Sequence, residues 1–170
     1  PELAGDAYEL TSYEMATFLA YTYTGSTPDQ TLLDAAARDE LRTEARIIEQ
    51  ATRLAGNATQ VMGDFVGSWL GTADLHVAAK DTMNWPNFED LVPHLQQEIN
   101  TTFSHIMLDP AESYATLYAG NYTYLNAPLA QHYGISGVTG TELQRVETTD
   151  RGGILANGAF MSRWGEALET

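Results

Sequence analysis

The sequence contains no cysteine among its 170 residues. This absence excludes disulfide bonds, catalysis by a thiolate and metal sites with cysteine ligands. It also excludes a covalently attached c-type haem within this chain, because that attachment needs a Cys-x-x-Cys-His motif. Any chemistry that the chain performs must therefore come from its oxygen and nitrogen groups.

Positive charge is scarce as well. Eight lysine and arginine residues stand against 23 aspartates and glutamates, which gives a net charge of −15, and Lys80 is the only lysine. An acidic surface repels the phosphates of nucleic acids and of anionic lipids, so we expect no nucleic-acid partner. A basic partner, a divalent cation or a salty environment would each suit this charge, but we favour the simpler interpretation that it keeps the protein soluble.

Long apolar runs are also missing. No segment approaches the roughly eighteen apolar residues that span a bilayer, so we expect no membrane insertion. The first residues, Pro1–Ala4, have neither the positive nor the apolar region of a signal peptide, and they lack an initiator methionine. We therefore expect the chain to be a processed or trimmed piece of a longer protein.

What is present favours a folded, mainly helical domain. Hydrophobic residues make up 44% and charged residues 18% of the chain, which is an ordinary globular mixture. We predict an all-α fold, an irregular domain of about six to eight helices, with a short strand or extended segment over 143–147. The predicted helices begin at about residue 11 and at Pro28, cover about 43–55, 58–70 and 90–108, and continue as short helices over 110–135.

Several helix ends have recognisable signals. Thr11 followed by Glu14 predicts a capping box, and Gly25 predicts the end of that first helix. Pro28 suits the first turn of the next helix, with Thr27 as its cap. On the helix over 58–70, the predicted buried stripe consists of Val61, Met62, Phe65, Val66 and Trp69.

The long helix over about 90–108 carries the most suggestive polar residues. Asp90 is its predicted cap, with Asn87 as the cap only if the helix kinks, because proline is tolerated in a first turn but not in a helix interior. His94, Glu98 and His105 fall within about 40° of one another around the helix, and the apolar residues centre roughly 110° away.

This polar stripe has two interpretations. Two imidazoles and a carboxylate could hold zinc or another divalent metal, but His94 and His105 lie about 16 Å apart along the axis, which is too far for one ion. His94 and Glu98 are therefore the metal-ligand candidates, and they would need further ligands from elsewhere. We favour the alternative, a polar flank that makes hydrogen bonds at a face between domains.

Two further motifs could carry function. His132 lies in the block Asn-x-x-Leu-Ala-Gln-His-Tyr-Gly, and it could act as a general base or a haem ligand, or fix a short helix by bonding a buried carbonyl or Asn126. Arg151-Gly152-Gly153 could bind a phosphate before a helix, but it has neither Walker nor Rossmann spacing. We favour a turn that needs a positive φ and close helix approach.

Several segments, in this order and spacing, resemble the PSD-type domain, a domain of unknown function found in planctomycete-type multidomain cytochrome c proteins. The most specific is the run from Tyr-Thr-Tyr-Leu-Asn to Leu-Ala-Gln-His-Tyr-Gly within 122–134. One departure is Thr24, where the family often has tryptophan. The weaker segments are Tyr13–Pro28, Phe65–Leu70, Gly137–Gly140 and Arg151–Leu155.

The resemblance implies a domain organisation. Residues from about 9 to 148 match the PSD-type domain, so we predict that domain over 1–148, with residues 149–170 as the truncated beginning of the following domain. The chain stops at Glu169-Thr170, and a domain cut there would expose unfinished core, so we expect more protein in the natural molecule.

The resemblance also implies a location, a cofactor and partners for the parent protein. Such proteins are large and exported, which implies a periplasmic or extracellular location, and they carry a c-type haem domain elsewhere in the chain. We therefore expect no cofactor within this chain, and we expect its partners to be other domains of the same parent, the haem domain first. The resemblance supplies no catalytic residues.

Three functions remain open at this point. The first is an accessory domain that docks on the haem domain, which predicts a large apolar patch. The second is an enzyme domain with its active site at the junction with its neighbours, with His132, Glu98 and His105 as the catalytic candidates in a concave pocket. The third is a subunit of a larger electron-transfer assembly, which predicts a partner with a basic surface.

Overall fold

The computed structural model describes residues 1–4, 7–78, 80–149 and 151–165. Within this part of the chain the fold is mainly α, with eight α-helices and two small two-stranded sheets, which confirms the predicted fold class. The chain forms two compact units, Pro1–Val61 (unit 1) and Met62–Thr170 (unit 2), and each is described by itself. No described helix is both long enough and apolar enough to cross a membrane.

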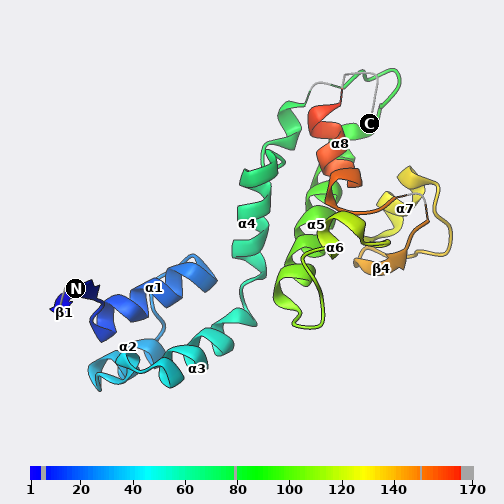
Figure 1. Cartoon of the computed structure of the whole chain (residues 1–170). Coiled ribbons are helices and arrows are strands. Elements are labelled where there is room, and N and C mark those ends of the chain that lie inside the picture. The colour runs from blue at the N-terminus through cyan, green and yellow to red at the C-terminus, as the bar shows by residue number, and fades with distance from the viewer. Residues whose placement is uncertain (5–6, 79, 150, 166–170) are drawn as a thin grey trace. The chain divides into compact units, whose positions relative to one another are not determined.

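Unit 1 is a small helical cluster that follows an N-terminal hairpin (Figure 1). The hairpin pairs two antiparallel strands, with Glu2 opposite Glu9, and the sequence did not predict it. The core consists mostly of alanine and leucine side chains from the three helices α1 to α3. The elements are β1 (Glu2–Ala4), β2 (Ala7–Glu9), α1 (Ser12–Thr24), α2 (Gln30–Ala37), the 3-10 turn η1 (Glu40–Arg42) and α3 (Glu44–Ala55).

The ends of α1 confirm the sequence prediction, whereas the start of α2 corrects it. Thr11 and Glu14 form the predicted capping box, and Gly25 ends α1 with a positive φ of 63°. The predicted cap Thr27 is wrong, because Asp29 accepts a hydrogen bond from the backbone of Leu32 and α2 begins two residues after Pro28. An aspartate is as good a cap as a threonine, and here it also pairs with an arginine of α3.

Helix α4 (Thr59–Leu70) lies where it was predicted, but it buries a different face. Its buried residues include Gly63 and Val66, whereas Phe65 and Trp69 are 55% and 50% exposed. Gly63 lets this helix approach α5 closely, since a Cβ at that position would lie 3.2 Å from the side chain of Asn100. The predicted buried stripe was therefore wrong for the two aromatic residues.

Unit 2 is built around the long helix α5 (Phe88–Leu108), whose buried residues lie mostly on one broad face. Figure 1 shows α8 alongside α5, and the sheet of β3 and β4 also packs on it. The other elements of the unit are η2 (Leu75–Val77), α6 (Thr116–Ala119), β3 (Tyr122–Leu125), α7 (Ala127–Tyr133), β4 (Gln144–Glu147), η3 (Ile154–Ala156) and α8 (Gly158–Trp164).

Two boundaries in unit 2 differ from the prediction. Helix α5 begins at Phe88, after Asn87, rather than at Asp90, so Pro93 is its sixth residue. Pro93 therefore lies in the second turn, inside the helix, where it cannot donate the backbone hydrogen bond that any other residue would make. Strand β4 confirms the predicted extended segment, and it pairs antiparallel with the unpredicted strand β3, with Thr123 opposite Val146.

The Arg-Gly-Gly turn has the conformation that favours its structural interpretation. Gly153 has a φ of +72°, and its amide donates a hydrogen bond to the carbonyl of Gly120 over 3.0 Å. A side chain at Gly153 would overlap the backbone carbonyls of Leu117 and Tyr118. The glycines therefore allow this segment to lie directly against the end of α6.

The predicted domain boundary between 148 and 149 stays a prediction. The described residues after it, η3 and α8, contact α5 in unit 2. The chain end at Glu169-Thr170, on which the predicted truncation depends, lies outside the described residues.

The close approach of α8 to α5 and α7 yields a test. A Cβ at Gly158 would overlap the Tyr133 hydroxyl and lie 2.7 Å from Cδ2 of Leu95, so Gly158→Ala should lower the free energy of unfolding of unit 2 by about 1–3 kcal/mol. Tryptophan fluorescence during urea unfolding measures this unit alone, because Trp69, Trp85 and Trp164 are the three tryptophans of the chain and all lie in it.

The matched control is Gly67→Ala in α4, where a Cβ would lie 3.4 Å from that of Ala73, an ordinary contact distance. This control should change the stability by no more than about 1 kcal/mol. Equal effects of the two substitutions would contradict the packing described for α8.

Candidate functional site

The interior of unit 2 contains a carboxylate. Glu98, on α5, is only 1% exposed. Its Oε1 accepts a hydrogen bond from the Thr123 hydroxyl of β3 over 2.7 Å, and its Oε2 accepts one from the Tyr133 hydroxyl at the end of α7 over 2.5 Å. The carboxylate therefore joins the three elements α5, β3 and α7.

Burial and hydrogen bonding act on Glu98 in opposite directions. Burial raises the pKa of Glu98 to about 7 from its usual 4.5, and the hydrogen bonds from Thr123 and Tyr133 and the positive charge of Arg151 offset part of that rise. Burial also raises the pKa of Tyr133, as does the adjacent Glu98 carboxylate, so this phenol stays protonated and remains a donor. Glu98 is consequently poised to exchange a proton near neutral pH.

The surroundings of Glu98 are closed. The guanidinium of Arg151 lies 3.8 Å from the centre of the Tyr133 ring and donates to the carbonyl of Ala156 over 3.3 Å. The cavity that Glu98 and Arg151 line has a volume of about 20 Å³, room for a single water molecule. Proton exchange is possible in such a space, but binding of a substrate is not.

A much larger pocket lies on another side of α5. It has a volume of about 510 Å³, and its walls come from the loop around Trp85, from the first turns of α5 and from α7. His94 and His132, two of the residues singled out in the sequence, both line it. No local pattern pairs them, because 38 positions separate the two histidines in the chain.

His94 has a defined orientation in this pocket. The side-chain amide of Asn126, which is fully buried, donates to Nδ1 of His94 over 2.9 Å. An amide nitrogen can only donate, so Nδ1 accepts and the neutral ring carries its proton on Nε2. The oxygen of the same amide caps α7 by accepting from the backbone of Leu129 over 3.2 Å. Asn126 thus bonds His94, rather than His132 as the sequence had suggested.

His132 is held by aromatic rings. Its ring lies edge-on to Trp85, with 5.9 Å between the centres, and 5.2 Å from the centre of the Tyr133 ring. Burial lowers the pKa of His132, and the nearby charge of Arg151 lowers it further. This imidazole is therefore neutral at pH 7.

His105 belongs to a third environment, near the other end of α5. Its Nε2 lies 3.5 Å from Glu112 and 3.9 Å from Asp109, and its ring stands edge-on to Tyr122 and Tyr124. The polar stripe predicted on α5 is therefore divided between the pocket, the buried carboxylate and this surface cluster. The three catalytic candidates, His132, Glu98 and His105, do not converge on one pocket.

The metal-ligand candidates acquire no third ligand. Among the residues that the structure describes, no three histidine, aspartate or glutamate side chains come together as a group that could hold a metal ion. His94 bonds Asn126, and Glu98 bonds Thr123 and Tyr133. These hydrogen bonds connect α5 to β3 and α7, which gives a physical reason for polar residues at positions 94 and 98 of α5.

Residues 10–135 match the family described as a protein of unknown function (DUF1592). This chain belongs to the DUF1592 family. The matched region contains His94, Glu98, His105 and His132, so every catalytic and metal-ligand candidate lies within the DUF1592 domain, whereas Arg151 and α8 lie beyond the match. No curated protein and no solved structure matches the chain.

The raised pKa of Glu98 predicts a pH-dependent stability for this DUF1592 domain. The folded chain binds the Glu98 proton more tightly than the unfolded chain does, so the free energy of unfolding of unit 2 should fall as the pH rises from about 4.5 to about 7. The total loss should be roughly 3 kcal/mol, since one pKa unit corresponds to about 1.4 kcal/mol. The lowered pKa of His132 acts in the opposite direction, because it favours folding as the pH rises.

The measurement compares urea unfolding of the wild type with that of Glu98→Gln between pH 4.5 and 8, followed by tryptophan fluorescence. The amide fills the same space without titrating, and His132 is present in both proteins. The difference between their stabilities should therefore shift in favour of the variant as the pH rises. A difference that is independent of pH would contradict the burial of a titrating carboxylate.

Proposed function

We propose that this chain is an accessory interaction domain of an exported, multidomain c-type cytochrome-like protein, and that it docks on the haem-bearing domain of the same parent. The observation that carries the proposal is an ordered pair of exposed aromatic side chains on α4. Phe65 and Trp69 lie one turn apart, with 6.0 Å between their ring centres, and both are at least half exposed.

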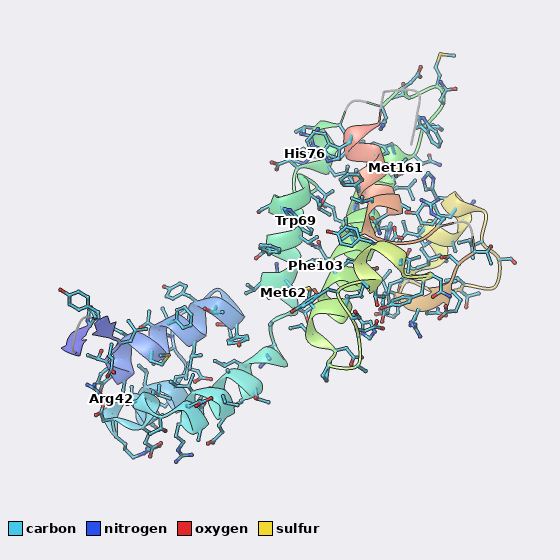
Figure 2. All side chains as sticks on the ribbon, in the orientation of Figure 1. Arg42, Met62, Trp69, His76, Phe103 and Met161 are labelled. Atoms are coloured by element: carbon cyan, nitrogen blue, oxygen red, sulfur yellow. The ribbon has the colours of Figure 1, made fainter. Side chains whose placement is uncertain are left out.

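A buried aromatic ring of α5 packs against this pair and holds it in position. The ring of the buried Phe103, on α5, lies 5.8 Å from Phe65 and 6.2 Å from Trp69. Figure 2 labels Trp69 on α4 and Phe103 on α5. Because the rings are already ordered, a partner that covers them does not have to immobilise flexible side chains. Large aromatic side chains also dominate the binding energy of protein interfaces. We name Phe65 and Trp69 the α4 aromatic pair.

Charge supports the same proposal. The net charge of −15 favours a partner whose contacting surface is basic around an apolar centre, since complementary charge guides association and excludes wrong partners. In unit 1 the four arginines all make ion pairs with carboxylates of their own unit. The surplus negative charge is therefore available to a basic surface.

The alternative function is enzymatic, and one observation favours it. The 510 Å³ pocket contains two histidines, one of them oriented by a buried asparagine, which is an arrangement that proton transfer can use. An exposed aromatic pair has no part in such a function.

The haem setting is tested by visible absorption spectra of the natural parent protein, first oxidised and then reduced, beside those of the 170-residue chain. We expect haem bands in the parent and none in the chain, which has no cysteine for haem attachment. A haem band in the chain itself would contradict the accessory function. The absence of haem bands from both proteins would contradict the proposal that the parent is a c-type cytochrome-like protein.

Docking is tested by hydrogen exchange in the same two proteins. Backbone amides of α4 should exchange more slowly in the parent than in the 170-residue chain, and Trp69→Ala in the parent should abolish most of the difference. Tyr118→Ala is the control, because Tyr118 is also an exposed aromatic residue and lies outside the α4 aromatic pair. Equal exchange of α4 in parent and chain would contradict docking through this face.

A further inference from the structure

We propose that the pocket between the start of α5 and α7 binds a neutral, hydroxyl-rich ring, that is, a mono- or disaccharide. This inference does not depend on the docking function, because the α4 aromatic pair is not among the residues that line the pocket.

The pocket has the size and construction of a small-molecule site. Its volume of about 510 Å³ lies within the range of roughly 300–1,000 Å³ that is usual for such sites. It is formed by two helices and a loop that packs on them, with Phe88 buried beneath it and Trp85 partly exposed in its wall. Ring faces of this kind cover the apolar C–H face of a sugar.

The charged groups that line the pocket disfavour anions. None of the described residues that line it is a lysine or arginine, so a phosphate or carboxylate would find no such basic side chain to pair with. An acidic side chain, Asp90, is among the described residues that line it, and its carboxylate would repel an anion. The exposed carboxylate of Asp90 can instead accept hydrogen bonds from hydroxyl groups.

The other polar groups in the wall are suited to hydroxyls. A hydroxyl both donates and accepts, and so do side-chain amides and a neutral imidazole such as that of His132. The bond from Asn126 leaves Nε2 of His94 as a donor, while His132 is neutral and offers one donor and one acceptor. Gln131, exposed on α7 beside His132, offers both kinds of group.

An organic cation fits less well. Trp85 and Asp90 could attract one, but a quaternary ammonium ion has no acceptor for the donors of His94 and Gln131. The partly buried Nε2 donor of His94 would therefore gain no partner from such a cation, whereas a hydroxyl would supply one. One aromatic side chain together with several groups that both donate and accept hydrogen bonds thus favours a sugar over a cation.

The test is titration of the ¹⁵N-labelled chain with methyl glycosides of glucose, galactose and mannose and with cellobiose and lactose, followed by NMR. Inorganic phosphate and tetramethylammonium are the comparison probes. We expect at least one glycoside to shift amide signals within 84–94 and 128–132, with a larger response than either ion gives. No response to any of the sugars at tens of millimolar, or a stronger response to either ion, would overturn the proposal.

Two variants locate the site. Gln131→Ala should weaken glycoside binding several-fold, and it leaves the fold intact because Gln131 is exposed. Trp85→Ala should weaken it at least tenfold through loss of the ring face. The matched control is His76→Ala, an exposed histidine of η2 that is not among the residues lining the pocket (Figure 2). The proposal would also be overturned if Gln131→Ala and Trp85→Ala left the affinity for the glycoside unchanged. An equal loss of affinity in His76→Ala would overturn it as well.

Discussion

The hydrogen bond from the Tyr133 hydroxyl to the buried carboxylate of Glu98 is the contact on which most of unit 2 depends. Removing a carboxylate from water is costly, and the cost is recovered only where donors and positive charge surround it. Thr123, Tyr133 and Arg151 supply these groups from three separate segments. The same hydroxyl lies so close to α8 that only glycine fits at position 158.

This bond also has a counterpart one turn earlier on α5. His94 bonds Asn126, which caps the start of α7, while Glu98 bonds Tyr133, the last residue of α7. Helix α7 is thereby fastened to α5 at both ends. Its residues Gln131 and His132 form one wall of the large pocket, so the shape of that pocket depends on a hydrogen bond in the protein interior.

The sequence predicted the elements whose signals are local. The capping box at Thr11, the helices α3 and α4 and the strand β4 all follow from residues within a few positions of one another. Strand β3 was missed because both of its faces are largely buried, so its residues lack the alternation that marks a half-exposed strand. The choice of Asp29 over Thr27 as a cap was missed because both residues suit that position equally.

The candidate site could not be predicted in full, because its contacts join residues that are far apart in the sequence. Helical periodicity placed His94, Glu98 and His105 on one stripe, which was correct, and predicted a polar flank at a face between domains. The flank instead meets β3, α7 and the Arg151 segment, because these later parts of the same chain fold back over it. Periodicity also placed Phe65 and Trp69 in the core, since it cannot distinguish an apolar face that is buried within the domain from one that is exposed.

The most direct measurement of this arrangement is an NMR titration of the ¹³C carboxyl signal of Glu98 in the folded chain. A buried carboxylate held by Thr123 and Tyr133 predicts a midpoint near pH 7, well above that of the exposed glutamates. A midpoint near pH 4.5, the ordinary value for glutamate, would show that Glu98 faces water and would contradict the connection of α5 to α7 through its carboxylate.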